Sequence, residues 1–345
     1  MTAPLVAIVI VNYNTGDETI AAIRHVRATT RVAHEIVVVD NGSIDGSAAA
    51  IGEAFPDVVV VDAGGNVGFA AGVNLGARCS GAPWILLLNP DTEALPGAVD
   101  ALVGFAQTHP EYGLYGGRTL RTDGSTDPSS CWGPMTTWSL FTFATGLSTI
   151  FKRSPLFDPE SLGRWERDTV REVPIITGCL LLISRENWQR LGGMDERFFL
   201  YGEDADFSRR ARDLGLRPVI VPDAVIIHTV GGSTSSSGLK MSMVMAGKAT
   251  LLHTAWPPVR RTVGVALLQL GALLRSRSAT WRTVWRRRRD WRAGYPAAKT
   301  ALFPTDITPA SDPSASIEVA PHHPRGPQGP SRDRVASAAR TEESR

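Results

Sequence analysis

The chain has 345 residues, of which 43% are hydrophobic and 20% charged, and its formal net charge is +2. This composition is that of a globular protein long enough for two domains, and it excludes a charged, tail-like polymer. The three cysteines, Cys79, Cys131 and Cys179, lie far apart and show no CxxC spacing. We therefore expect reduced thiols in an intracellular protein, with no secretory signal and no transmembrane helix.

The first part of the chain alternates between strand-like and helix-like segments. Short apolar runs predict strands, and longer amphipathic segments predict the helices between them. This βαβ repetition predicts an α/β fold with a mostly parallel, Rossmann-like sheet and right-handed crossovers. The predicted strands are Leu5–Val11, Glu35–Val39, Val58–Val61 and Trp84–Leu88, and the predicted helices are Asp17–Thr29, Ser43–Phe55, Phe69–Cys79 and Pro96–Thr108.

The regular pattern weakens after Gly116. Residues 118–172 are rich in Gly, Pro, Ser and aromatic residues, which predicts long loops or a mobile flap that forms one wall of a pocket. A regular pattern then returns. It predicts a β-rich run at Val173–Ser184, helices at Arg185–Leu191, Glu203–Leu214 and Leu239–Leu252, and a strand at Arg217–Val221 that leads to His228.

The C-terminal part is basic. Between Pro258 and Tyr295 there are ten arginines and one acidic residue. One or two amphipathic helices are predicted within Arg260–Trp291, with tryptophans on one face and arginines on the other, and such helices are typical of binding to an anionic membrane surface. Nucleic-acid binding is the competing interpretation, but the amphipathic pattern favours the membrane. Beyond Pro296 the many prolines and the near absence of aromatic residues predict disorder.

We therefore predict a domain over residues 1–256 that divides into two halves, 1–116 and 117–256. Membrane-associating helices would follow at 257–295, and a disordered tail at 296–345. 

Asn89-Pro90-Asp91 follows the apolar run Trp84–Leu88, whose composition is that of a strand buried on both faces. A polar tripeptide at the carboxyl end of such a strand lies in the crevice where open α/β sheets bind ligands. A single carboxylate there suits Mg²⁺ or Mn²⁺, because substrate phosphates complete the coordination shell of these ions. A simple turn is the alternative, since Asn, Pro and Asp are common turn residues.

Two further polar residues end apolar runs. Asp40 ends the second predicted strand, where its carboxylate could accept the imide N–H of uracil or thymine, or could merely form an Asx turn. His228 ends the run Val225–Ile227 and could be a structural hydrogen-bonding residue or a second metal ligand beside Asp91. The two interpretations of Asp40 and the two of His228 stay open at this point.

Glu203, Asp204 and Asp206 lie in the first turn of a predicted helix. Acidic residues there favour the helix dipole. The preceding apolar and aromatic residues, Phe198–Gly202, suggest instead a desolvated pocket, in which burial raises a carboxyl pKa toward that of a useful general base. 

These motifs, taken together and in order, resemble the family 2 glycosyltransferases with the GT-A fold, in particular the rhamnosyltransferase branch. The resemblance covers roughly Val6 to His253. It implies a GT-A domain over 1–256, with 1–116 as the nucleotide-sugar-binding half and 117–256 as the acceptor-binding and catalytic half. It rests on Ile10-Val11-Asn12-Tyr13-Asn14, Val39-Asp40-Asn41-Gly42-Ser43, Asn66-Val67-Gly68-Phe69-Ala70-Ala71-Gly72-Val73-Asn74, Asn89-Pro90-Asp91, Thr177-Gly178-Cys179, Gly202-Glu203-Asp204-Ala205-Asp206 and His228.

The resemblance implies a role for each matching residue. Asp40 would read the pyrimidine base, Asp204 would be the catalytic base with Glu203 beside it, and Asp91 and His228 would hold Mg²⁺ or Mn²⁺. Asn89 stands where many relatives have the first Asp of the DxD motif, of which Asp91 would be the surviving acid, and Asn89 could bind the ribose or nucleotide instead. The residues implied to bind the nucleotide sugar are Asn12, Asn14, Asp40, Asn41, Asn66, Gly68, Asn74 and Asn89, and those implied to bind the acceptor are Gly178 and Cys179.

The implied activity is inverting transfer of L-rhamnose from dTDP-rhamnose to a polyprenyl-diphosphate-linked N-acetylglucosamine acceptor. This step belongs to cell-wall biosynthesis (the arabinogalactan linker), and the protein would be peripheral on the cytoplasmic face of the cell membrane, without a nucleic-acid partner. The alternatives are a family 2 transferase that uses a UDP-sugar (galactofuranosyl or N-acetylglucosaminyl) and a non-catalytic sugar-nucleotide-binding membrane scaffold. A nucleotidyltransferase is disfavoured because residues 12–16 contain no Lys or Arg.

Overall fold

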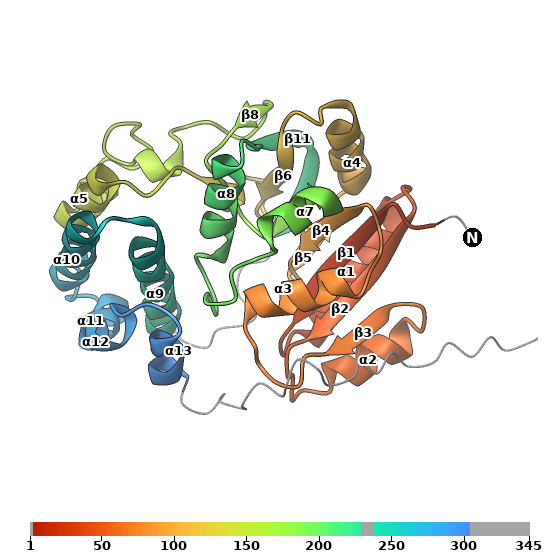
Figure 1. The fold of residues 1–345 in the computed structure, drawn as a ribbon, viewed down its shortest axis with the longest axis horizontal. Helices are drawn as coiled ribbons and strands as arrows, with labels where there is room; N and C mark the ends of the chain where they lie inside the picture. The colour runs from red at the N-terminus through yellow and green to blue at the C-terminus, as the bar shows by residue number, and fades with distance from the viewer. Residues whose placement is uncertain (1–2, 229–236, 304–345) are drawn as a thin grey trace, which may run out of the picture. The chain divides into compact units, whose positions relative to one another are not determined.

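The computed structural model describes residues 3–228 and 237–303, which belong to one compact unit that spans Met1–Ser311 (Figure 1). Its main sheet has nine strands within these residues. They are β1 (Val6–Asn12), β2 (His34–Asp40), β3 (Val59–Asp62), β4 (Trp84–Leu88), β5 (Thr92–Ala94), β6 (Gly113–Leu120), β8 (Arg171–Glu172), β10 (Leu180–Ser184) and β11 (Arg217–His228).

The strand order is β3-β2-β1-β4-β10-β6-β11-β5, with β8 paired to β11. The four strands β3, β2, β1 and β4 are parallel, as are β6 and β11, whereas β10, β5 and β8 run antiparallel to their neighbours. The predicted α/β fold with a mostly parallel sheet is therefore confirmed. The strands β5, β6 and β8 were not predicted from the sequence, and β11 is longer than the predicted strand Arg217–Val221.

Helices cover both faces of the sheet, and β1 shows why. Its side chains alternate, so that Val6, Ile8 and Ile10 pack in one core cluster and Val9 and Val11 in another. The helices of the first cluster are α1 (Gly16–Thr29), α2 (Ser47–Ala54) and α4 (Ala98–Thr108). Those of the second are α3 (Phe69–Arg78), α7 (Arg185–Leu191) and α8 (Glu203–Asp213).

A third core cluster lies among helices beside the sheet, at the left of Figure 1. Buried residues from the middle and from the end of the chain share this cluster, so residues 257–295 pack with helices that precede them. The helices are α5 (Thr137–Thr145), α9 (Ser237–Ala255), α10 (Pro258–Leu274), α11 (Ala279–Arg286), α12 (Arg288–Trp291) and α13 (Ala297–Leu302).

The prediction of long loops over 118–172 is wrong for residues 137–145, which form α5. A capping box begins this helix, because Thr136 accepts from the Ser139 N–H and the Ser139 hydroxyl accepts from the Thr136 N–H. Apolar side chains lie on more than one side of the helix, which hides its periodicity in the sequence. Shorter elements in and after this region are Pro128–Ser130 and Pro159–Ser161 (3₁₀ turns), β7 (Cys131–Trp132), α6 (Leu147–Ile150) and β9 (Ile175–Ile176).

One prediction about the C-terminal part needs correction. Residues 297–302 form α13 instead of disordered chain, and Ala298 and Leu302 are buried there. The side chain of Trp291 is fully buried and donates a hydrogen bond to the Val284 carbonyl at 2.8 Å. The tail from residue 304 onward lies outside the described residues. None of the described helices is long and apolar enough to cross a membrane.

Candidate active site

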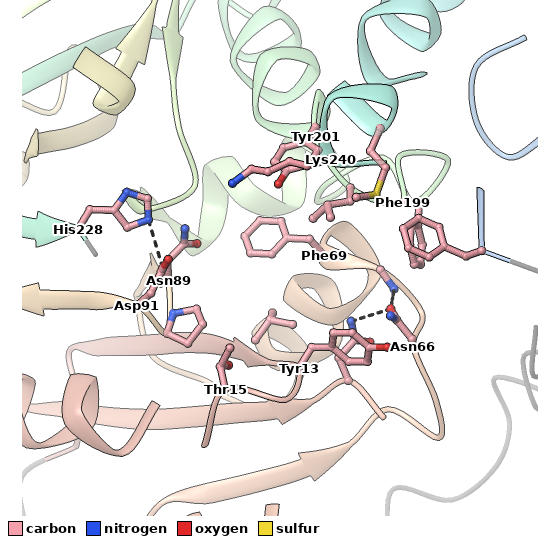
Figure 2. Close-up of a pocket in the computed structure, with 17 residues that line it drawn as sticks. Tyr13, Thr15, Asn66, Phe69, Asn89, Asp91, Phe199, Tyr201, His228 and Lys240 are labelled. Carbon is pink, nitrogen blue, oxygen red and sulfur yellow. Dashed lines mark hydrogen bonds and ion pairs between the residues drawn. The ribbon is translucent and has the colours of Figure 1, made fainter. Parts of the chain in front are cut away.

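A cavity of about 240 Å³ opens beyond the carboxyl ends of β1, β2 and β4 (Figure 2). This is where open α/β sheets bind their ligands, because the parallel strands place their last residues at one edge. The register supports this arrangement, since Asn12 lies opposite Asp40 at the ends of β1 and β2. Among the residues predicted from the sequence, those that line the cavity are Asn41, Asn66, Gly68, Asn89, Asp91 and His228.

Asp91 and His228 meet across this cavity although 137 residues separate them. β11 pairs with β5 so that His228 lies opposite Thr92, the residue after Asp91. His228 Nε2 is 3.2 Å from Asp91 Oδ1, as the dashed line in Figure 2 shows, and both side chains are largely shielded from solvent. A carboxylate oxygen and an imidazole nitrogen this close need a proton or a cation between them.

The Asp91–His228 pair fits a divalent metal of the Mg²⁺ or Mn²⁺ kind. Within residues 3–228 and 237–303, no group of three or more His, Cys, Asp and Glu side chains could hold an ion. Such ions do not require more protein ligands, because phosphate oxygens and water complete their shell. Asn89 lines the same end of the cavity with an amide in place of a second carboxylate.

Asn41 and Asn66 fix the loop that forms the opposite end of the cavity. The Asn41 side chain donates to Asn66 Oδ1 at 3.1 Å and accepts from the Val67 N–H at 2.9 Å. Gly68 follows with φ +94°, and a Cβ atom there would come within 2.5 Å of the Phe199 carbonyl oxygen. The loop can therefore approach Phe199 only with glycine at this position.

Asn12 and Asp40 lie just behind the cavity. Asn12 is fully buried, and its amide group donates to Asp40 Oδ1 at 2.8 Å. Asp40 Oδ2 accepts from the Ser43 N–H at 3.1 Å. The Asn12 side-chain oxygen accepts from Thr15 and from one other threonine hydroxyl, so the whole side chain is used internally. We interpret Asn12 as a positioning residue for Asp40, whose contact with a base stays a prediction.

Asn14 and Asn74 also lie outside the cavity lining. Asn14 adopts φ +53° and accepts from the Ile44 N–H at 2.8 Å, which orders the loop after β1. Asn74 is buried and exchanges hydrogen bonds with the backbone of Met194, both at 2.9 Å, and it donates to Glu196 as well. This contact ties α3 to the loop before α8. We therefore assign Asn74 to positioning that loop instead of to contact with a nucleotide.

Asp204 lies close to the cavity wall but is not part of its lining. Burial raises the pKa of the Asp204 carboxyl, and the backbone N–H groups of Ala205 and Gly178 offset part of this shift. Gly178 packs against Phe69, which lines the cavity. These contacts bring a carboxyl group with a raised pKa next to the cavity. Such a group was predicted from the apolar and aromatic residues Phe198–Gly202 that precede it.

Glu203 is more deeply buried than Asp204. Burial and the neighbouring Asp204 carboxyl raise its pKa, and within the described residues its Oε2 atom has no hydrogen-bond partner. Burial raises the pKa of Tyr295 and the Glu203 carboxyl raises it further, which places Glu203 near the C-terminal helices. Cys179 is buried too, and burial raises the pKa of its thiol to about 11, so it stays protonated. The acceptor-binding role of Gly178 and Cys179 stays a prediction.

Several residues that line the cavity were not predicted as site residues. Phe199, Leu200 and Tyr201 belong to the apolar and aromatic run before α8, which was expected to form a desolvated pocket. Lys240 is different, because nothing in the sequence marks it. It lies in the first turn of α9, and Figure 2 shows its amino group extending toward the end that Asn89, Asp91 and His228 occupy. The other lining residues that were not predicted are Val11, Tyr13, Thr15, Phe69, Pro90, Met243 and Phe303.

The cavity thus combines a carboxylate–imidazole pair, a lysine, amide groups and aromatic walls at the edge of an α/β sheet. These features define an enzyme that binds a phosphorylated, nucleotide-like substrate. Comparison with known proteins makes the class specific. Residues 7–161 match the Glycosyl transferase family 2 domain, and residues 168–230 match a domain described as the N-terminal domain of galactosyltransferase.

The chain is 31% identical over 242 residues to the N-acetylglucosaminyl-diphospho-decaprenol L-rhamnosyltransferase of Mycobacterium tuberculosis, which covers 66% of this chain and 76% of that protein. It is 28% identical over 210 residues to the low-salt glycan biosynthesis hexosyltransferase Agl10 of Haloferax volcanii, with 60% and 61% covered. The chain belongs to glycosyltransferase family 2, and it is a glycosyltransferase of the rhamnosyltransferase branch.

A solved structure supports the fold. The mannosyltransferase of Pyrobaculum calidifontis, solved with GDP-mannose and Mn²⁺, superposes with a TM-score of 0.54 at 18% identity, and the match covers 88% of this chain and 89% of that one. The likeness confirms the GT-A architecture predicted from the motifs. 

Proposed function

We propose that the protein transfers L-rhamnose from dTDP-rhamnose to a polyprenyl-diphosphate-linked N-acetylglucosamine, with inversion at the anomeric carbon. The observation that carries this proposal is the Asp91–His228 pair at the strand-end cavity, opposite Lys240. Support for the sugar and the acceptor comes from the Mycobacterium tuberculosis relative, whose name specifies both. In that setting the product is an intermediate of cell-wall (arabinogalactan linker) synthesis.

The donor would lie along the cavity with its base near Tyr13 and Asn66 and its diphosphate near Asp91. Tyr13 offers an aromatic face, and amide groups of the Asn41–Asn66 loop offer hydrogen bonds. At the other end, the ammonium group of Lys240 would bind the diphosphate through charge-assisted hydrogen bonds. We include Asp40 in this proposal as the residue that selects a pyrimidine, from its place at the end of β2 beside the cavity.

Asp204 would act as the general base. Its raised pKa suits the removal of a proton from the acceptor hydroxyl while that oxygen attacks the anomeric carbon and the nucleoside diphosphate leaves. Asp91 and His228 would hold Mg²⁺ or Mn²⁺, which when bound neutralises charge on the leaving diphosphate. The Mn²⁺ in the Pyrobaculum calidifontis mannosyltransferase supports this choice of ion. Lys240 would supply a second positive charge to the same group.

A polyprenyl-linked acceptor is anchored in a lipid bilayer, so we also propose that the protein works as a peripheral protein on the cytoplasmic face of the cell membrane. In this proposal the donor cavity lies in the compartment in which nucleotide sugars are made and consumed.

Transfer assays with the purified full-length protein test this function. With dTDP-rhamnose, Mg²⁺ and polyprenyl-diphospho-N-acetylglucosamine, we expect a rhamnosylated lipid with the anomeric configuration inverted relative to the donor. Parallel reactions with UDP-galactofuranose and UDP-N-acetylglucosamine serve as donor controls. Transfer from a UDP-sugar but not from dTDP-rhamnose would refute the donor, and the domain match of residues 168–230 favours such a donor as the second candidate.

A further inference from the structure

The helix α10 carries apolar side chains on a face that no part of the described chain covers. Its buried face packs inward through Gly264, Leu268 and Ala272. The exposed residues recur at spacings of three and four, which places them in one stripe along the helix. They are Val259, Val263, Ala266, Leu270, Leu273 and Leu274.

The segment α5–α6 lies beside α10 and runs in the same direction. Hydrogen bonds join Arg260 to Thr137 near the start of both segments and Arg275 to Thr149 near their ends, each at 3.1 Å. The two helices approach closely, since a Cβ atom on Gly271 would lie 2.4 Å from Phe143. This neighbouring segment exposes large apolar side chains of its own, namely Trp138, Phe141, Ile150, Phe151 and Leu156.

We call these two sets of exposed side chains the α5–α10 surface. Exposure of this extent is costly in water, and it includes Ile150 at 71% and Leu274 at 58%. Two of the aromatic side chains, Trp138 and Phe141, stack at a centroid distance of 5.5 Å, and Trp138 donates to the Leu156 carbonyl. The apolar groups of the α5–α6 segment are therefore held together by the fold.

Within the two segments that form this surface all charges have one sign, while Asp158 and Glu160 lie beside them in contact with Arg153 and Ser139. Residues 137–157 and 257–278 contain six basic residues and no acidic residue. One of the six, Arg153, pairs with Glu166 from outside these segments at 3.3 Å. A surface of apolar stripes bordered by basic side chains matches a bilayer with anionic headgroups, in which apolar groups enter the acyl boundary and cations meet the phosphates.

We propose that the α5–α10 surface docks this enzyme on an anionic lipid bilayer. A second copy of the chain fits less well, because a symmetric contact would bring the basic borders of the two copies together. The choice of a bilayer over another protein rests in part on the proposed function, whose acceptor is a lipid. The docking surface uses α10 and the α5–α6 segment, whereas the tryptophan Trp291 of the arginine-rich block packs inside the protein.

Vesicle flotation of the full-length protein tests the proposal. We expect wild type to float with vesicles of phosphatidylglycerol and phosphatidylcholine and to stay behind with phosphatidylcholine alone. The double variants Leu270→Glu/Leu274→Glu and Ile150→Glu/Phe151→Glu should each weaken binding about tenfold or more, because each removes two apolar side chains from the bilayer. Arg277→Gln should weaken it about fivefold.

Leu214→Glu is the matched control, because Leu214 ends α8 outside this surface and is 44% exposed, close to the 40% of Leu270. Its flotation should equal that of wild type. Flotation of both double variants at the wild-type level would overturn the proposal. It would also be overturned if wild type were a dimer and the double variants were monomers that float as wild type does.

Transfer to a soluble short-chain acceptor separates this proposal from the proposed function. The double variants should transfer rhamnose to that acceptor at the wild-type rate while they fail to float. If wild type floats with the vesicles but transfers no rhamnose, the docking surface is supported and the proposed function is refuted. 

Discussion

The strand-end edge of the sheet and the helices of the C-terminal part both contribute to the cavity, but they do so in different ways. At the sheet edge, Asn89 and Asp91 follow directly from the end of β4, and hydrogen bonds within the loops fix their neighbours. The helical part contributes Lys240, Met243 and Phe303 from α9 and from the end of α13. The sheet edge therefore supplies the Asp91–His228 pair, and the helices close the cavity and add the cationic side chain of Lys240.

This difference explains which interactions each region should control. A reacting group at the sheet edge acts on rate or on metal binding, whereas a residue from the helices acts on affinity for the donor. Substitutions in the two regions should consequently change different measured quantities.

The largest effect should come from Asp204→Asn. Removal of a general base lowers kcat by roughly 10²- to 10⁴-fold, and donor affinity should stay within about twofold of wild type. Because burial raises the pKa of Asp204, the base loses its charge at a higher pH than an ordinary aspartate does, and the wild-type kcat should fall as pH decreases through that raised value. Steady-state kinetics over a range of pH check both expectations.

Asp213→Asn is the control on the same helix, since Asp213 is an exposed residue paired with Arg209. Its kcat should match wild type. An Asp204→Asn enzyme with wild-type turnover would remove Asp204 from the chemistry.

Lys240→Met tests the contribution of the helical region. Loss of a charge-assisted hydrogen bond should weaken dTDP binding by roughly 10- to 100-fold, while the affinity for thymidine, which lacks phosphates, stays unchanged. Lys240→Arg should restore most of the affinity. Calorimetric titration of both ligands measures this. Equal weakening of dTDP and thymidine would mean that Lys240 shapes the cavity and does not bind the diphosphate.

Asn89→Asp tests the sheet edge by adding a carboxylate close to Asp91 in the cavity lining. A second carboxylate beside Asp91 should tighten Mn²⁺ binding by about tenfold, because each acidic ligand adds charge to the site. Titration of Mn²⁺ into the apoprotein, followed by electron paramagnetic resonance, measures the change. Unchanged Mn²⁺ affinity would mean that residue 89 does not face the ion.

Glu203→Gln should have the smallest effect, and it concerns stability. The pKa of Glu203 is raised in the folded state, so folded protein keeps this proton to a higher pH than unfolded protein does. The free energy of unfolding should therefore fall as pH rises from the ordinary carboxyl pKa to the raised one. Glutamine removes this loss and should stabilise the protein by about 1 kcal/mol at pH 8. Denaturant unfolding at pH 5 and pH 8 checks the sign.

The sheet and its strand-end residues could be predicted from sequence because they depend on local patterns. Buried strands are continuous apolar runs, and their carboxyl ends share one edge, so Asp91 and His228 could be expected at one site. The pairing of β11 with β5 that brings them to 3.2 Å follows from chain topology, which no local pattern encodes.

The helical part was less predictable for a related reason. An amphipathic pattern shows that a helix has an apolar face but not whether that face meets protein or membrane. Trp291 turned inward and Leu274 outward although both are apolar residues of helical segments. Lys240 could not be identified either, because a lysine in the first turn of a helix is ordinary and only its position over the cavity gives it a role.

The binding of dTDP with and without Mn²⁺, measured by calorimetry in wild type and in Asp91→Asn, tests the central claim most directly. If the Asp91–His228 pair holds a metal against the donor diphosphate, Mn²⁺ should strengthen dTDP binding by about tenfold or more in wild type and not at all in the variant. Equal affinities with and without Mn²⁺ in wild type, or a full Mn²⁺ effect in Asp91→Asn, would contradict it.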